Sequence, residues 1–108
     1  MHVEYLKQFI DALENSKFYA GDRVVGGYEQ GMQQLLDIFT DVKKAGGTGY
    51  FAGNGGSAAI ASHMTSDFKK NGNMKTGALL DASVLTCFGN DFGYEYIYSK
   101  QLEQIGNE

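Results

Sequence analysis

A glycine-rich segment in the middle of the chain, Gly-Asn-Gly-Gly-Ser-Ala-Ala at residues 53–59, constrains the fold more than any other feature. It follows an apolar, β-prone run at 48–52 and precedes a long helical pattern. Glycine tolerates positive φ angles and lets an anion approach the backbone closely. The free N–H groups and the dipole of the following helix would face that anion, and the hydroxyl of Ser57 can cap the helix or bind a phosphate oxygen. The segment therefore predicts a strand, a phosphate-binding turn and a helix, in that order.

The spacing of these glycines excludes two common nucleotide-binding motifs. It is neither the G-x-G-x-x-G pattern of dinucleotide-binding proteins nor a P-loop, because no Gly-Lys-Ser/Thr follows. A strand-to-helix turn with a purely structural role stays open as an alternative, since glycines punctuate loops in many proteins.

Composition narrows the class of protein. The chain has 108 residues, 43% of them apolar, and a net charge of −4, which indicates one globular domain and disfavours a nucleic-acid-binding surface. Its single cysteine, Cys87, excludes an intrachain disulfide and fits a reducing compartment. Cys87 lies in an apolar run, so we expect it in the core. Because the sequence shows neither a transmembrane-length apolar run nor a signal-peptide pattern, we expect a cytoplasmic protein with no membrane partner.

Hydrophobic periodicity predicts alternating helices and strands. The expected order is a helix at 3–13, a turn or partly ordered segment at 15–27, a helix at 32–42, a strand at 50–52, a helix at 57–68, a strand at 76–80, a short helical or irregular piece at 81–89 and a helix at 94–105. This order is typical of an α/β domain with a parallel sheet, in which ligands bind at the carboxyl ends of the strands. Two strands leave a small sheet with open edges, so we expect the sheet to be completed by a larger fold or by other chains.

Two pairs of polar residues follow the glycine-rich segment. His63 and Asp67 are one turn apart on the same helix face, where they suit acid–base chemistry, metal ligation or a simple surface pair. Asn90 and Asp91 lie between two glycines. Asp91 has the chemistry to bind substrate hydroxyls or transfer a proton, and the local pattern also favours an Asn-Asp-x-Gly turn that caps the next helix.

Taken together, the segment 53–59, His63 and the run Ser-Val-Leu-Thr-Cys-Phe-Gly-Asn-Asp-Phe-Gly-Tyr at 83–94 closely resemble the phosphoheptose isomerases of the sugar isomerase (SIS) domain superfamily. Both motifs occur in the family's order and spacing. The resemblance implies an α/β fold with a doubly wound parallel sheet flanked by helices, and a cytoplasmic homotetramer whose N-terminal helices pack between subunits. It also implies an isomerase that converts sedoheptulose 7-phosphate to D-glycero-D-manno-heptose 7-phosphate for lipopolysaccharide and other bacterial surface polysaccharides.

The same resemblance implies roles for individual residues. The expected substrate-binding residues are Asn54, Gly55, Gly56, Ser57, Asn90 and Asp91. Ser57 would bind the phosphate and Asp91 the sugar hydroxyls. His63 and Asp67 would be ligands of a Zn²⁺ ion, and Asp67 would also be the catalytic acid–base that moves a proton between C1 and C2. Asp67 stands where the family usually has a glutamate, which is one methylene longer.

The length of the chain departs from the family, whose members are nearly twice as long. Residue 108 falls before the family's Ser/Thr-rich phosphate loop and before the later helix with the remaining metal ligand and base. We therefore expect residues 1–108 to form the N-terminal portion of one SIS domain. A non-catalytic SIS protein, such as a sugar-phosphate sensor or a scaffold similar to the DnaA initiator-associating protein, is the main alternative. A truncated product without a function of its own is the third.

Overall fold

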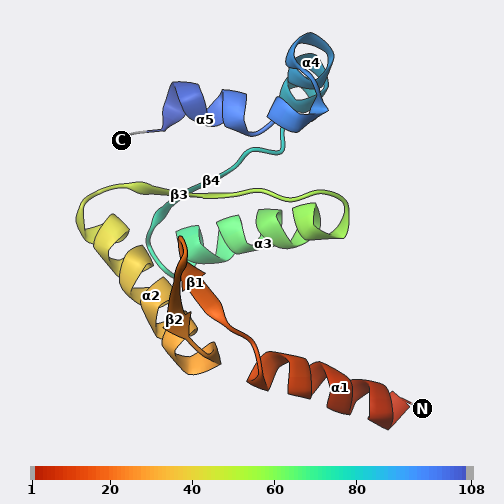
Figure 1. The fold of residues 1–108 in the computed structure, drawn as a ribbon. Coiled ribbons are helices and arrows are strands. Elements are labelled where there is room, and N and C mark those ends of the chain that lie inside the picture. The colour runs from red at the N-terminus through yellow and green to blue at the C-terminus, as the bar shows by residue number, and fades with distance from the viewer. Residues whose placement is uncertain (1, 107–108) are drawn as a thin grey trace. The chain divides into compact units, whose positions relative to one another are not determined.

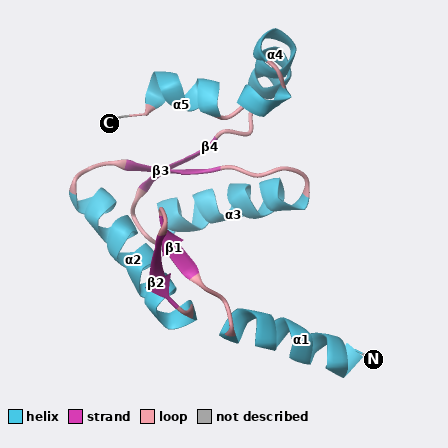
Figure 2. Ribbon diagram, in the orientation of Figure 1, coloured by secondary structure: helices cyan, strands magenta, loops and turns pink. Residues whose placement is uncertain are grey.

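The structure, a computed structural model, describes residues 2–106. Helices and short strands alternate along the chain in the order α1-β1-β2-α2-β3-α3-β4-α4-η1-α5 (Figures 1 and 2). The chain divides into two compact units, Met1–Lys44 and Ala45–Glu108. The expected α/β class is thereby confirmed. The doubly wound sheet is not seen, because the strands between residues 2 and 106 form two separate two-stranded sheets.

The first unit contains two helices and a β-hairpin. Helix α1 (His2–Glu14) leads to β1 (Phe18–Ala20), β2 (Arg23–Gly26) and helix α2 (Tyr28–Lys44), and β1 pairs with β2 in antiparallel register. The turn expected within 15–27 is present at residues 21–22, but the two strands that flank it were not predicted. The hairpin has a physical basis in the sequence, since Gly21 adopts a φ of 60° in the tight turn between two short β-prone runs.

The second unit is built on a strand–helix–strand crossover. Strand β3 (Thr48–Phe51) pairs in parallel with β4 (Lys75–Ala78), and helix α3 (Gly56–Lys70) connects them and packs on both strands. The strands and the helix expected here are confirmed, with small shifts of their ends. The apolar side chains buried among the described residues all belong to this unit: Ala61, Met74, Leu79 and Ile97. Parallel pairing places the ends of both strands, Phe51 and Ala78, at one edge of the pair.

The segment after β4 is helical but more divided than expected. Asp81 caps helix α4 (Ala82–Phe92) by accepting a hydrogen bond from the Val84 N–H at 3.1 Å. The helix continues past residue 89 and ends before Gly93, whose φ is 107°. A 3-10 turn, η1 (Tyr94–Tyr96), and helix α5 (Ser99–Ile105) replace the single helix expected at 94–105.

The expectation that Cys87 lies in the core was wrong, because its side chain is exposed. Leu85 and Phe88 are half-buried along one stripe of α4, whereas Cys87 lies on the flank that carries Asp91. One helix turn therefore mixes core and surface positions that an apolar run alone does not separate. None of the described helices is both long and apolar enough to cross a membrane.

Candidate functional site

The glycine-rich segment forms the loop between the end of β3 and the start of α3, as the sequence predicts. The Ser57 hydroxyl donates to the Asn54 carbonyl oxygen at 2.7 Å and accepts from the Asn54 N–H at 2.8 Å. The Ser57 N–H donates to the same carbonyl at 3.1 Å. Ser57 lies inside the first turn of α3 and the N-cap is Gly55, so of the two roles that the sequence leaves open for the Ser57 hydroxyl, capping the helix is excluded. Its hydroxyl instead closes the loop on Asn54.

The three glycines of the loop serve different physical purposes. A Cβ on Gly53 would lie 2.6 Å from the Ser57 carbonyl carbon, so a side chain there is excluded. Gly55 adopts a φ of 57° and ψ of −124°, a conformation that favours glycine. A Cβ on Gly56 would meet nothing within 4 Å. Among the described residues, the N–H groups of Gly55 and Gly56 donate no hydrogen bond, so two backbone donors remain available at the start of α3.

Tyr98 contacts the loop although it lies 44 residues after Asn54 in the sequence. It was not identified from the sequence as a site residue. Its hydroxyl lies within hydrogen-bonding distance of the Gly53 carbonyl oxygen and of Asn54 Oδ1. Tyr94 is 68% exposed, whereas Tyr98 is half-buried. The alternation of tyrosines at 94, 96 and 98 was the available signal, because one face of such a run must meet a partner or a pocket.

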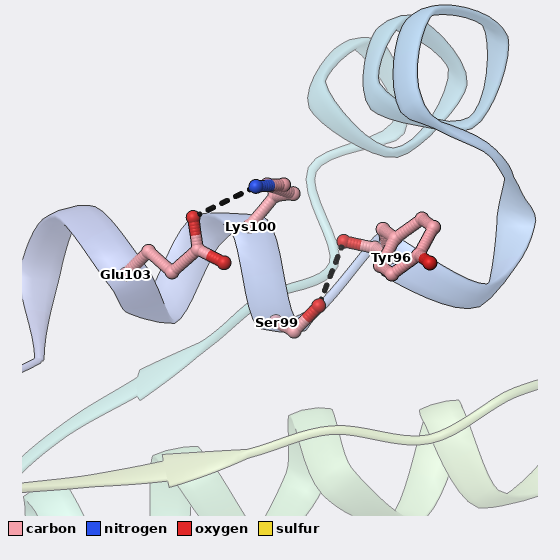
Figure 3. A network of polar contacts seen from close by, with 4 residues as sticks. All are labelled: Tyr96, Ser99, Lys100 and Glu103. Carbon is pink, nitrogen blue, oxygen red and sulfur yellow. Dashed lines mark hydrogen bonds and ion pairs between the residues drawn. The ribbon is translucent and has the colours of Figure 1, made fainter.

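The segment around Tyr98 is also attached to the carboxyl end of β4. The side-chain amide of Gln101 donates to the Ile97 carbonyl at 2.7 Å and to the Leu79 carbonyl at 3.4 Å. Figure 3 shows further contacts within this segment, in which the Ser99 hydroxyl donates to the Tyr96 carbonyl at 3.5 Å. Lys100 and Glu103 form an ion pair at 3.0 Å on the same helix. Of these contacts, the bond from Gln101 to Leu79 holds the start of α5 next to the edge of the strand pair that carries the loop.

His63 and Asp67 form the pair that their spacing predicts. His63 Nε2 and Asp67 Oδ2 are 3.2 Å apart, with side chains 73% and 41% exposed. Both lie farther along α3, because ten residues separate Ser57 from Asp67 and a helix rises about 1.5 Å per residue, or about 15 Å in total. The structure therefore brings the two residues together but not to the loop of the same chain.

The donor set tests whether Zn²⁺ fits at this pair. An imidazole and a carboxylate are suitable ligands, and catalytic zinc sites use three protein ligands. Across residues 2–106, no third His, Cys, Asp or Glu joins the pair in a cluster. Residues 2–106 of one chain thus supply two of the three ligands that such a site requires.

Asn90 and Asp91 lie in the last turn of α4, so the alternative in which they form a turn that caps the next helix is wrong. Asn90 Nδ2 donates to Asp91 Oδ1 at 3.0 Å, and the Cys87 thiol donates to Asp91 Oδ2 at 3.5 Å. The hydrogen bond to Asp91, followed by the negative charge of that carboxylate, raises the pKa of the Cys87 thiol. The described contacts of both side chains are within their own helix.

The fold and the loop define the class as an α/β protein with a glycine-rich turn at the carboxyl end of a parallel strand pair. Comparison with known proteins refines this class, although no protein-family model matches the chain. Phosphoheptose isomerase from Akkermansia muciniphila is 40% identical over 81 residues, which cover 69% of this chain and 43% of that protein. The enzyme of the same name from Clostridium acetobutylicum is 32% identical over 95% of this chain and 57% of its own length.

A solved structure agrees with these relatives. Phosphoheptose isomerase GmhA from Neisseria gonorrhoeae matches with a TM-score of 0.59 and 35% identity, over 69% of this chain and 41% of that chain. The chain is a homologue of the phosphoheptose isomerases, which confirms the resemblance inferred from the sequence. It spans about half the length of the curated relatives that it matches.

Proposed function

We propose that this chain supplies the substrate-binding portion of a phosphoheptose isomerase site, which acts in the cytoplasm on sedoheptulose 7-phosphate and yields D-glycero-D-manno-heptose 7-phosphate. The observation that carries the proposal is the loop at 53–57, where two backbone donors at the N-terminus of α3 have no partner among residues 2–106. Homology to phosphoheptose isomerases supports this choice of substrate over other anions.

The phosphate would be held mainly by the backbone N–H groups of Gly55 and Gly56. Open space lies above both positions, and the positive end of the helix dipole favours an anion there. The Ser57 hydroxyl already donates to Asn54. Its first task is therefore to hold the loop closed, and it donates to the phosphate only by releasing the Asn54 carbonyl.

The isomerisation requires a proton to move between C1 and C2, and a carboxylate is suited to this transfer. We assign this role to Asp67. Its distance along α3 from the loop excludes direct contact with a phosphate bound there, so Asp67 acts at the sugar end of an extended substrate or on a substrate held by another copy of the chain. Asn90 and Asp91 would bind sugar hydroxyls from α4.

We infer a homo-oligomer, with four copies as the expected number, and the exposed apolar face of α1 supports association between copies. Its large apolar side chains are 43–71% exposed: Val3, Tyr5, Leu6, Phe9, Ile10 and Leu13. A helix with one wide apolar stripe buries that stripe against another element.

The decisive experiment measures binding and turnover separately. Sedoheptulose 7-phosphate is titrated into the protein by calorimetry, and product formation is followed by ³¹P NMR. We expect Gly56→Ala to weaken binding, because a methyl would occupy the space above the donors. We expect Asp67→Asn to leave binding intact and abolish turnover, and Asp67→Glu to retain turnover.

The outcomes separate the candidate functions. Absence of binding by the wild-type chain would contradict the proposal and would leave a product without a function of its own. Binding without turnover, unchanged by substitution of Asp67, would indicate the alternative of a non-catalytic SIS sugar-phosphate-binding or scaffold protein.

A further inference from the structure

The contact between Tyr98 and the glycine-rich loop links residues that are 44 positions apart in the sequence. The Tyr98 hydroxyl is 2.9 Å from Asn54 Oδ1 and also reaches the Gly53 carbonyl oxygen. A tyrosine hydroxyl carries one proton, so it donates to one of these two oxygens at a time. Both acceptors lie at the start of the loop, and either bond therefore holds the same part of the backbone.

The contact with Asn54 has a chemical consequence for ligand recognition. A carboxamide presents an acceptor oxygen on one side and two N–H donors on the other. When Oδ1 faces the Tyr98 hydroxyl, Nδ2 faces away from it, and the hydrogen bond of the Asn54 side chain with the described residues is the one from Tyr98. The donors of Asn54 then add to the free N–H groups of Gly55 and Gly56.

An oxyanion accepts hydrogen bonds and donates none while it is fully ionised. A surface composed only of donors suits it, whereas an outward-facing Oδ1 would repel it. A bound phosphate therefore favours the state in which the Tyr98 proton lies on Asn54 Oδ1 and Nδ2 faces the ligand.

We propose that Tyr98 is a positioning residue, whose hydroxyl orients the Asn54 carboxamide so that the loop presents donors to the phosphate of the substrate. This inference rests on the proposed function for the identity of the ligand. It goes beyond that function by assigning a role in recognition to a residue outside the loop and outside α3.

The test compares wild-type protein with Tyr98→Phe, which removes only the hydroxyl. Tyr94→Phe is the matched control, because Tyr94 is 68% exposed and its hydroxyl makes no hydrogen bond among the described residues. Binding of inorganic phosphate and of sedoheptulose 7-phosphate is titrated for each protein. We expect Tyr98→Phe to weaken both affinities about fivefold, the equivalent of about 1 kcal/mol for one hydrogen bond. Tyr94→Phe should change them less than about twofold.

A double-mutant cycle with Asn54→Ala distinguishes positioning from general stabilisation. If Tyr98 acts through the Asn54 carboxamide, Tyr98→Phe should have almost no further effect on affinity in the Asn54→Ala background. Equal fivefold losses in both backgrounds would overturn the proposal, as would unchanged affinity in the single variant.

A second measurement stands independently of the ligand. The side-chain NH₂ resonances of Asn54 in a ¹H–¹⁵N spectrum should shift in Tyr98→Phe and stay in place in Tyr94→Phe. If the wild-type chain binds neither phosphate nor sugar phosphate, the proposed function fails, and these resonances alone decide the role of Tyr98. Resonances that do not respond to loss of the hydroxyl would contradict it.

Discussion

Replacement of the loop glycines one at a time gives the sharpest test of how the loop is built. In Gly53→Ala the new methyl would lie 2.6 Å from the Ser57 carbonyl carbon and oxygen and 2.7 Å from Ser57 Oγ. Two of these atoms belong to the backbone of the first turn of α3, which cannot swing aside as a flexible side chain does. The loop must therefore move away from the helix start.

The cost follows from the bonds that this movement breaks. The two hydrogen bonds between the Ser57 hydroxyl and Asn54, at 2.7 and 2.8 Å, cannot both survive. At about 1 kcal/mol for each bond, together with residual steric strain, we expect a loss of about 2–3 kcal/mol in the free energy of unfolding. That loss is a large part of the stability of a small domain.

The two neighbouring glycines provide matched controls, for which we expect opposite changes in the free energy of unfolding. Gly56→Ala places a methyl in open space on a helical residue, so it should stabilise by about 0.4–1 kcal/mol through the unfolded state. Gly55→Ala also meets no atom, but its φ of 57° strains a side chain, which should cost about 1–3 kcal/mol.

Urea unfolding monitored by circular dichroism measures all three variants against wild type. Gly53→Ala with wild-type stability, or with the same change as Gly56→Ala, would refute the contact between Gly53 and the start of α3. Gly56→Ala is also informative for function, because it should raise stability and weaken phosphate binding at the same time. Loss of both would indicate that the substitution damages the fold.

Three further predictions concern other parts of the chain. Leu6→Glu on the exposed apolar stripe of α1 should lower the oligomeric state in sedimentation equilibrium, whereas Gln8→Glu, a charge change on the polar face, should not. Asp91 raises the pKa of the Cys87 thiol, so Asp91→Asn should lower that pKa. The rate–pH profile of thiol alkylation should then shift to lower pH, with a faster reaction at pH near 8. An unchanged profile would contradict the contact between Cys87 and Asp91. The buried Thr76 hydroxyl donates to the Thr65 carbonyl at 2.7 Å, so Thr76→Val should lower the free energy of unfolding by about 1 kcal/mol. An unchanged urea midpoint would exclude a net contribution from this bond.

Local patterns in the sequence were sufficient for the strand–turn–helix unit and for the pairing of His63 with Asp67. In both cases the determinants lie within one or two helix turns of each other, where spacing alone sets the geometry. The hairpin in the first unit was missed although its signal is also local. Its strands are only three and four residues long, so alternation had little length over which to appear, and the turn chemistry of Gly21 was the better indicator.

The contact of Tyr98 with Asn54 is of a different kind, because its determinants are far apart in the sequence. Neither residue is unusual in its own segment, and only the parallel pairing of β3 with β4 brings the segment after α4 to the loop after β3. The same reasoning applies to the role proposed for Asp67. The spacing of His63 and Asp67 predicts a pair on one helix face, but the rise of the helix carries that pair away from the phosphate donors at its N-terminus. Whether a carboxylate meets the substrate thus depends on the length of the sugar and on which copy of the chain holds the phosphate. In the second arrangement the proposed site would require assembly, and the exposed apolar side chains of α1 form the surface through which we propose that copies associate.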